Sequence, residues 1–264
     1  MKIKRFKLIL FCCFSLALPP AALAEDIPDP KTTGLFKILP VTNPSYAMNF
    51  TGLGFKSGAG WWALSCDSAN GGCKLTRTKL KATRQQFSPE NFRQYADTVV
   101  GQSLHWTPAP PPGTVLLFKS KRFKRAQGPV ETYFFPIEGK EIFKEIGGTE
   151  LELALPKGVK AQLLPVMVLP NPKDTRSSKR LTLELRIGPK RQTLVDGGFS
   201  LVNQDYLVWA GDLEGDGKLD LLIKTGKLNN GVALFLSSLA KKDELLGEAG
   251  RFEVACPEEE KPCD

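Results

Sequence analysis

The sequence predicts a mainly β protein in which antiparallel sheets form a sandwich or barrel with one or two short helices. From residue 114 onward, short apolar runs recur at hairpin spacing and are separated by Gly, Pro, Asn and Asp. Upstream, Trp61–Cys66 and Cys73–Thr83 flank the turn-forming segment Asp67–Gly72, which is typical of a hairpin. No repeat with a period of roughly 20–50 residues is found, so the signature of a full propeller is missing.

Each expected strand is an apolar or alternating run bounded by turn residues. In the C-terminal part we expect strands at 115–118, 131–135, 149–155, 161–169, 181–187, 192–195, 205–210, 219–225 and 231–237. Short helical turns are expected at 140–146 and 240–246.

The clearest helix signal covers residues 88–102. Ser88-Pro89-Glu90 combines an N-cap residue, a first-turn Pro and an acid near the positive helix end. Apolar side chains follow at helical spacing and would cover a sheet face, namely Phe92, Tyr95, Val99 and Val100. Gly101 is expected to end the helix.

The first 24 residues have the pattern of a secretory signal, with cleavage expected after Ala24. A basic start precedes the apolar run Leu8–Leu18, which is too short to span a bilayer. Without the signal, 32 Lys and Arg face 28 Asp and Glu, a mildly basic balance. We expect a periplasmic or secreted protein with no membrane span after cleavage. Its organisation would be an extended lead-in at 25–45 and a β-rich domain at 46–264, with a possible sub-boundary at the Pro-rich segment 108–113.

Four cysteines remain after signal removal, in two pairs with six residues between partners: Cys66 with Cys73, and Cys256 with Cys263. An even count in an exported chain indicates disulfides, and local pairing costs the least chain entropy. The rival interpretation is a four-thiolate zinc site, but zinc pairs usually have two to four residues between ligands.

Two basic clusters stand out, one at Lys119–Arg125 and one at Lys173–Arg180. Either could contact phosphate or an anionic polysaccharide, although charge runs are more often solvated loops. Because Phe123 is the only aromatic residue in the first cluster, nucleic-acid binding is not expected. The single histidine, His105, lies between Leu and Trp, which is more typical of a packed or surface residue than of a catalyst. No nucleophile elbow, phosphate-binding loop or dinucleotide fingerprint is present.

The most specific motif is the nine-residue stretch 212–220. Calcium prefers six to eight oxygen ligands, and a short loop supplies them when alternate residues point inward around a sharp Gly turn. Here acids fall at positions 1, 3, 5 and 9, with Gly217 at position 6 and a backbone carbonyl available at position 7. The expected ligands of one structural Ca²⁺ are Asp212, Glu214, Asp216, Lys218 through its carbonyl, and Asp220.

Strand-like segments flank this loop, and position 12 is Ile223 rather than the Glu of an EF-hand. The stretch 210–222 therefore resembles the calcium-binding loop of the FG-GAP family, also called VCBS-type repeats. The resemblance implies the same five ligands. The sequence departs from the family at Glu214, where Asp or Asn is usual, and by having one copy of the motif.

Together these features predict an exported, non-enzymatic binding or accessory protein with a protein or polysaccharide ligand. One alternative is a secreted hydrolase of glycans or phosphoesters that uses carboxylates, for which Glu131, Glu138, Glu150 and Glu152 are available. A further alternative is an inhibitor or immunity-type protein.

Overall fold

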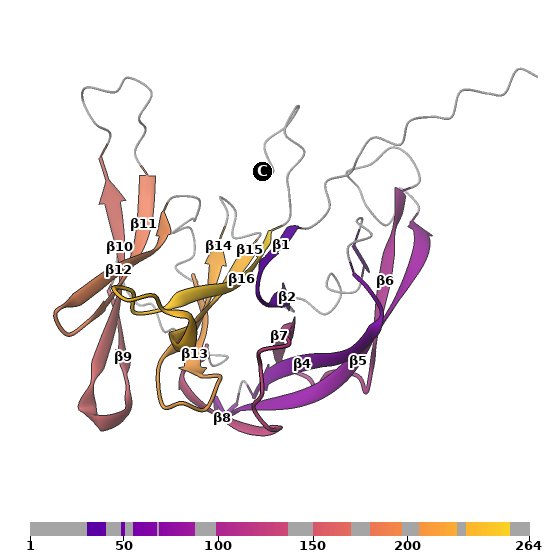
Figure 1. Ribbon diagram of the computed structural model, residues 1–264, viewed down its shortest axis with the longest axis horizontal. Helices are drawn as coiled ribbons and strands as arrows, with labels where there is room; N and C mark the ends of the chain where they lie inside the picture. Colours follow the sequence, from indigo (N-terminus) through magenta and orange to yellow (C-terminus); the bar gives the residue numbers. More distant parts are fainter. Residues whose placement is uncertain are drawn as a thin grey trace, which may run out of the picture.

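The computed structural model describes residues 31–40, 49–50, 55–67, 69–87, 99–136, 150–169, 180–196, 206–225 and 231–253. Within these ranges the chain is built almost wholly from antiparallel strands, as the sequence predicts (Figure 1). Two 3₁₀ turns, η2 (Pro156–Gly158) and η3 (Ser237–Leu239), are the helical elements among the described residues.

Twelve strands form one large sheet with the order β1-β16-β15-β14-β13-β8-β5-β4-β7-β2, while β6 extends from β5 and carries β3. Their bounds are β1 Lys31–Gly34, β2 Lys37–Pro40, β3 Asn49–Phe50, β4 Gly58–Cys66, β5 Cys73–Phe87, β6 Val99–Thr107, β7 Thr114–Lys119, β8 Gly128–Phe134, β13 Leu207–Asp212, β14 Asp220–Thr225, β15 Gly231–Leu236 and β16 Gly247–Glu253.

The large sheet curls until its two ends meet. Its terminal strands, β1 and β2, follow each other in the chain, and Phe36 between them donates its N–H to the carbonyl of Ala249 on β16 at 2.9 Å. The result is a nearly closed barrel, seen in Figure 1 as an arc from β16 through β8 to β7. Closure protects edge strands that would otherwise invite pairing with another chain.

A second sheet of four strands packs outside the barrel. It has the order β12-β11-β10-β9 and lies beside β13 and β14 in Figure 1. Its strands are β9 Leu151–Ala154, β10 Lys160–Val168, β11 Arg180–Ile187 and β12 Lys190–Asp196.

Strand β15 shows why the molecule has two cores. Val232, Leu234 and Leu236 belong to the barrel core with Trp61, Trp62 and Trp209. The alternate residues, Ala233 and Phe235, belong to the core against the outer sheet, with Leu163 and Leu185. Because successive side chains in a strand point to opposite faces, β15 must be apolar throughout, and all six of its residues are buried.

The helix predicted at 88–102 is wrong where the structure describes it. Residues 99–102 belong to β6, with Val99 opposite Phe87 and Gly101 opposite Gln85 on β5. The β-branched pair Val99-Val100 fits a strand better than a helix, and pairing along the whole of β5 outweighs the local helix signal. Residues 88–98 lie outside the described ranges, as do residues 140–146.

Two other expectations differ from the structure. Part of the lead-in at 25–45 forms β1 and β2, because Phe36, Ile38 and Leu39 are buried in the barrel core. Residues 240–246, where the sequence predicts a helical turn, form turns and bends between η3 and β16, which begins at Gly247. The segment 108–113 joins two strands of the same large sheet.

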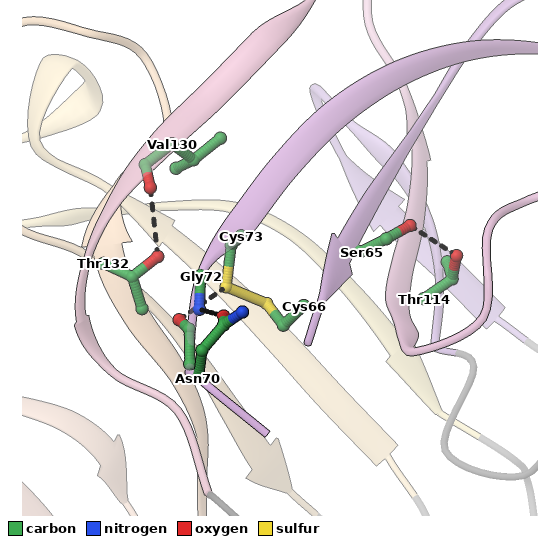
Figure 2. Close-up of a disulfide and its surroundings, with 9 residues drawn as sticks. Ser65, Cys66, Asn70, Gly72, Cys73, Thr114, Val130 and Thr132 are labelled. Atoms are coloured by element: carbon green, nitrogen blue, oxygen red, sulfur yellow. Dashed lines mark hydrogen bonds between the residues drawn. A yellow bond between two sulfur atoms is a disulfide. The ribbon is translucent and has the colours of Figure 1, made fainter. Parts of the chain in front are cut away.

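The predicted local disulfide is confirmed for Cys66 and Cys73, whose Cα atoms are 4.0 Å apart at the end of the β4–β5 hairpin (Figure 2). In the same view, the hydroxyl groups of Ser65 and Thr114 lie 2.6 Å apart between β4 and β7. Cys256, Cys263 and the signal segment lie outside the described ranges. The described residues include no helix of the length and apolarity needed to cross a membrane.

Candidate calcium loop

The 212–220 loop connects β13 to β14, which pair antiparallel with Gly211 opposite Asp220. Two apolar side chains hold the loop to the protein from inside. Leu213 is fully buried in the barrel core, and Leu219 is buried in the core of the outer sheet. The loop is thus fixed at the boundary between the two cores, with Glu214 and Asp216 between these anchors in the chain and Asp212 and Asp220 directly outside them.

Asp212 organises the turn through its carboxylate. Oδ1 accepts the N–H groups of Gly215 at 2.6 Å and Asp216 at 3.0 Å, and Oδ2 accepts the N–H of Gly217 at 2.8 Å. Such convergence requires a left-handed backbone at Gly215, with φ +80°, and at Gly217, with φ +75°. Glycine adopts these angles at little cost, which explains both glycines in the motif.

Asp220 closes the loop from its far end and is completely buried. Its Oδ2 accepts the N–H groups of Leu213 at 2.8 Å and Glu214 at 3.3 Å, while Oδ1 accepts the N–H of Ser237 at 2.9 Å. Burial raises the pKa of Asp220 to about 8, and the charges of Glu214 and Asp216 add to that rise, while the backbone hydrogen bonds oppose it. A cation beside Asp220 would favour its ionised form.

Asp216 and Lys218 lie at the outer rim of the loop. The Asp216 carboxylate accepts the N–H of Lys218 at 3.0 Å and the Ser237 hydroxyl at 3.2 Å. The Lys218 ammonium lies 3.2 Å from Oδ2 of Asp216, and this lysine side chain is 66% exposed. In this arrangement the protein's own ammonium group supplies the positive charge next to Asp216.

Glu214 differs from the other three acids because its Oε2 atom is buried and has no hydrogen-bond partner. A buried carboxylate oxygen left unsatisfied is costly, so contact with a donor or a cation would be favourable at this atom. A carboxylate offers about four acceptor positions, of which Asp212 and Asp220 each use three.

The candidate metal ligands therefore suit a hard cation, because every side-chain ligand atom is an oxygen. The carboxylates of Asp212, Asp216 and Asp220 nevertheless already contact N–H groups, Ser237 and Lys218. Across the described ranges, no three His, Cys, Asp or Glu side chains are grouped closely enough to form a metal centre.

Sequence reasoning missed Arg125 as a part of this site. One guanidinium nitrogen donates to the carbonyl of Asp212, and the other donates to the carbonyl of Pro129 at 3.0 Å. Arg125 thus links the first residue of the loop to the beginning of strand β8. The basic cluster 119–125 was the only sequence signal near it, and 87 residues separate Arg125 from Asp212.

The other sequence candidates are scattered. Glu152 forms an ion pair with Lys160 at 2.7 Å, Glu131 and Glu150 are exposed, and Glu138 lies outside the described ranges. His105 is exposed, with Nε2 3.2 Å from the Ser103 hydroxyl.

A pocket of about 270 Å³ lies beside the 212–220 loop. It is lined by Gly217–Leu219 and Ser237, together with Leu155–Lys157, Val159, Ile187 and Leu245–Leu246. No carboxylate lines this pocket, so it lacks the paired acids that a glycosidase needs.

Comparisons of the chain with family models, with curated proteins and with solved structures find no match.

Proposed function

We propose that the protein is an exported, non-enzymatic binding or accessory protein in which the 212–220 loop holds one structural Ca²⁺. The proposed ligands are the side chains of Asp212, Glu214, Asp216 and Asp220, and the carbonyl of Lys218. Bound calcium supplies positive charge and oxygen coordination that hold the loop in one conformation.

The observation that carries this proposal is the buried, unpartnered Oε2 of Glu214, in a loop whose four acidic side chains can all supply oxygen ligands. Asp220 supports it, because a completely buried carboxylate next to other acids gains most from a nearby cation. Export is supported by the signal-like pattern of residues 1–24 and by the Cys66–Cys73 disulfide, since structural disulfides persist in oxidising compartments.

Calcium would act on stability rather than on a reaction. A ligand that binds only the folded state stabilises it by about 2.7 kcal/mol at a free concentration one hundred times its Kd. For a domain of this size that corresponds to a rise in Tm of roughly 5–10 °C.

The test is thermal unfolding of the wild-type chain in excess Ca²⁺ and in excess chelator, together with calorimetric titration of Ca²⁺ into the folded protein. We expect a higher Tm with calcium and one binding event per chain. Asp216→Ala removes a ligand at the rim without exposing the buried loop anchors, so it should abolish both signals.

Lys218→Ala is the matched control, because it removes the side chain but keeps the carbonyl ligand. This variant should keep the calcium-dependent rise in Tm. Equal wild-type Tm values with calcium and with chelator, together with no heat of binding, would exclude the site.

A further inference from the structure

Two basic segments that are distant in sequence meet around one tryptophan. Trp62 on β4 lies directly opposite Arg77 on β5, and the Arg77 guanidinium is 4.0 Å from the centre of its ring. Phe123, in the loop after β7, packs against the same tryptophan edge-on, with ring centroids 5.2 Å apart. Phe123 also packs on Phe118 at 4.9 Å, so its loop is attached firmly at this point.

Exposed cations extend in both directions from this contact. Along β5, Arg77, Lys79 and Lys81 are exposed while Thr78 and Leu80 between them are buried. Alternate strand residues share a face and lie about 6.7 Å apart. Lys121, Arg122 and Lys124 flank Phe123 and are also exposed. We call this group the Trp62 basic surface: Arg77, Lys79, Lys81, Lys121, Arg122 and Lys124.

The charge distribution of the chain is strongly asymmetric. Residues 31–125 hold 14 Lys and Arg against three Asp and Glu, whereas residues 126–264 hold 18 against 22. The ion pairs of the described residues all lie beyond residue 150, as in Glu152–Lys160 and Arg251–Glu248. Within the described ranges, the cations of the Trp62 basic surface have no carboxylate partner. Such a surface has a positive field that attracts polyanions.

The surface also constrains the kind of polyanion. Single-stranded nucleic acids need exposed rings for base stacking, but Trp62 is 1% exposed and Phe123 is 7% exposed. Peripheral membrane binding needs several apolar side chains that insert. Of the four exposed large apolar residues of the described chain, Val159, Met167 and Leu169 lie at or beside β10 in the outer sheet, which leaves Leu35, between β1 and β2, in the large sheet.

A protein partner would normally bury aromatic anchors at the centre of the interface, and here the rings are already covered. Hydrated polymers with regularly placed anionic groups need neither rings nor apolar contacts. We therefore propose that the Trp62 basic surface binds an anionic polysaccharide that carries sulfate, phosphate or carboxylate groups. This inference gives a ligand class for the binding role proposed above and rests on that role, but it is independent of the calcium site.

The test is binding of the full chain to immobilised dextran sulfate, with uncharged dextran as the reference polymer, in calcium and in chelator. Two double variants remove charge from separate parts of the surface: Lys79→Thr with Lys81→Thr on β5, and Lys121→Ser with Lys124→Ser in the loop. Each should weaken binding about tenfold at low salt and flatten its salt dependence. The matched control, Lys241→Ser with Lys242→Ser, removes the same charge elsewhere and should change affinity less than about twofold.

Equal losses in the control and in the two surface variants would show binding by net charge alone and would overturn the proposal. Tighter binding to single-stranded DNA or to vesicles of anionic lipid than to dextran sulfate would overturn the ligand class. The unfolding curve of each variant reports on folding. If the protein binds dextran sulfate equally well in calcium and in chelator, this inference stands even when the calcium proposal fails.

Discussion

Two tight turns in the barrel each join a pair of antiparallel strands, but different interactions hold them closed. The turn at 66–73 joins β4 to β5 and is closed by a covalent bond between Cys66 and Cys73. The turn at 212–220 joins β13 to β14 and is closed by Asp212 and Asp220, whose carboxylates accept six backbone N–H groups between them. A disulfide acts mainly by restricting the unfolded chain, whereas carboxylate contacts stabilise only the folded turn.

The two turns differ in how deeply their polar side chains are buried. The disulfide turn has a local polar network, in which Asp67 accepts from Ala69 and Asn70, and its exposed side chains point to solvent. The acidic turn lies between two cores and contains a completely buried carboxylate. The acidic turn is therefore the one at which we propose that an ion changes stability.

The largest effect is expected when the acidic turn loses its buried anchor. Asp220→Ala leaves three N–H groups, those of Leu213, Glu214 and Ser237, without their acceptor. We expect the free energy of unfolding to fall by about 3 kcal/mol, measured by urea denaturation. Asp220→Asn keeps one accepting oxygen and should lose less.

The exposed acid Asp243 provides the control for this prediction. Asp243→Ala should change the free energy of unfolding by less than about 0.5 kcal/mol. If Asp220→Ala is as mild as Asp243→Ala, the acidic turn does not depend on its buried carboxylate.

A smaller effect is expected from opening the covalent turn. Reducing the Cys66–Cys73 bond releases a loop with a sequence separation of seven, for which the chain-entropy estimate is about 2.5 kcal/mol. Chemical reduction avoids placing a new polar group at these two buried positions. Urea denaturation with and without reductant measures the difference.

The same experiment sharpens the comparison when it is repeated in calcium and in chelator. The two turns share no residue or hydrogen bond among those described, so their effects should add. A calcium-dependent rise in stability that disappears on reduction would show that the turns are coupled.

The sequence predicted what depends on local pattern. Alternating and apolar runs placed most strands of the described chain, and the acid spacing with Gly217 located the acidic turn. Contacts between distant residues escaped prediction. In the sequence, Phe36 and Ile38 belong to a Pro-rich segment with no strand pattern. Their place in the sheet depends on contacts with β16 and β7, which are distant in the chain. The local sequence around Val99 and Val100 fits a helix as well as a strand, and it is pairing with β5 that selects the strand.

Arg125 is the clearest case of a residue whose role only the tertiary structure reveals, and it gives the smallest expected effect. Its two nitrogens donate to the carbonyls of Asp212 and Pro129, so it links the acidic turn to β8. Arg125→Met keeps the aliphatic length but loses both hydrogen bonds. Because the side chain is partly exposed, we expect a loss of about 1 kcal/mol in urea denaturation.

Arg125→Lys separates charge from geometry. An ammonium group keeps the positive charge but lacks the planar fork that reaches two carbonyls. If the fork is what matters, Arg125→Lys should lose nearly as much stability as Arg125→Met, while Arg122→Met, at an exposed neighbour in the same loop, should lose almost none. Full recovery in Arg125→Lys would instead mean that the acidic turn needs only a nearby positive charge, which would make Arg125 a partial substitute for the cation proposed at 212–220.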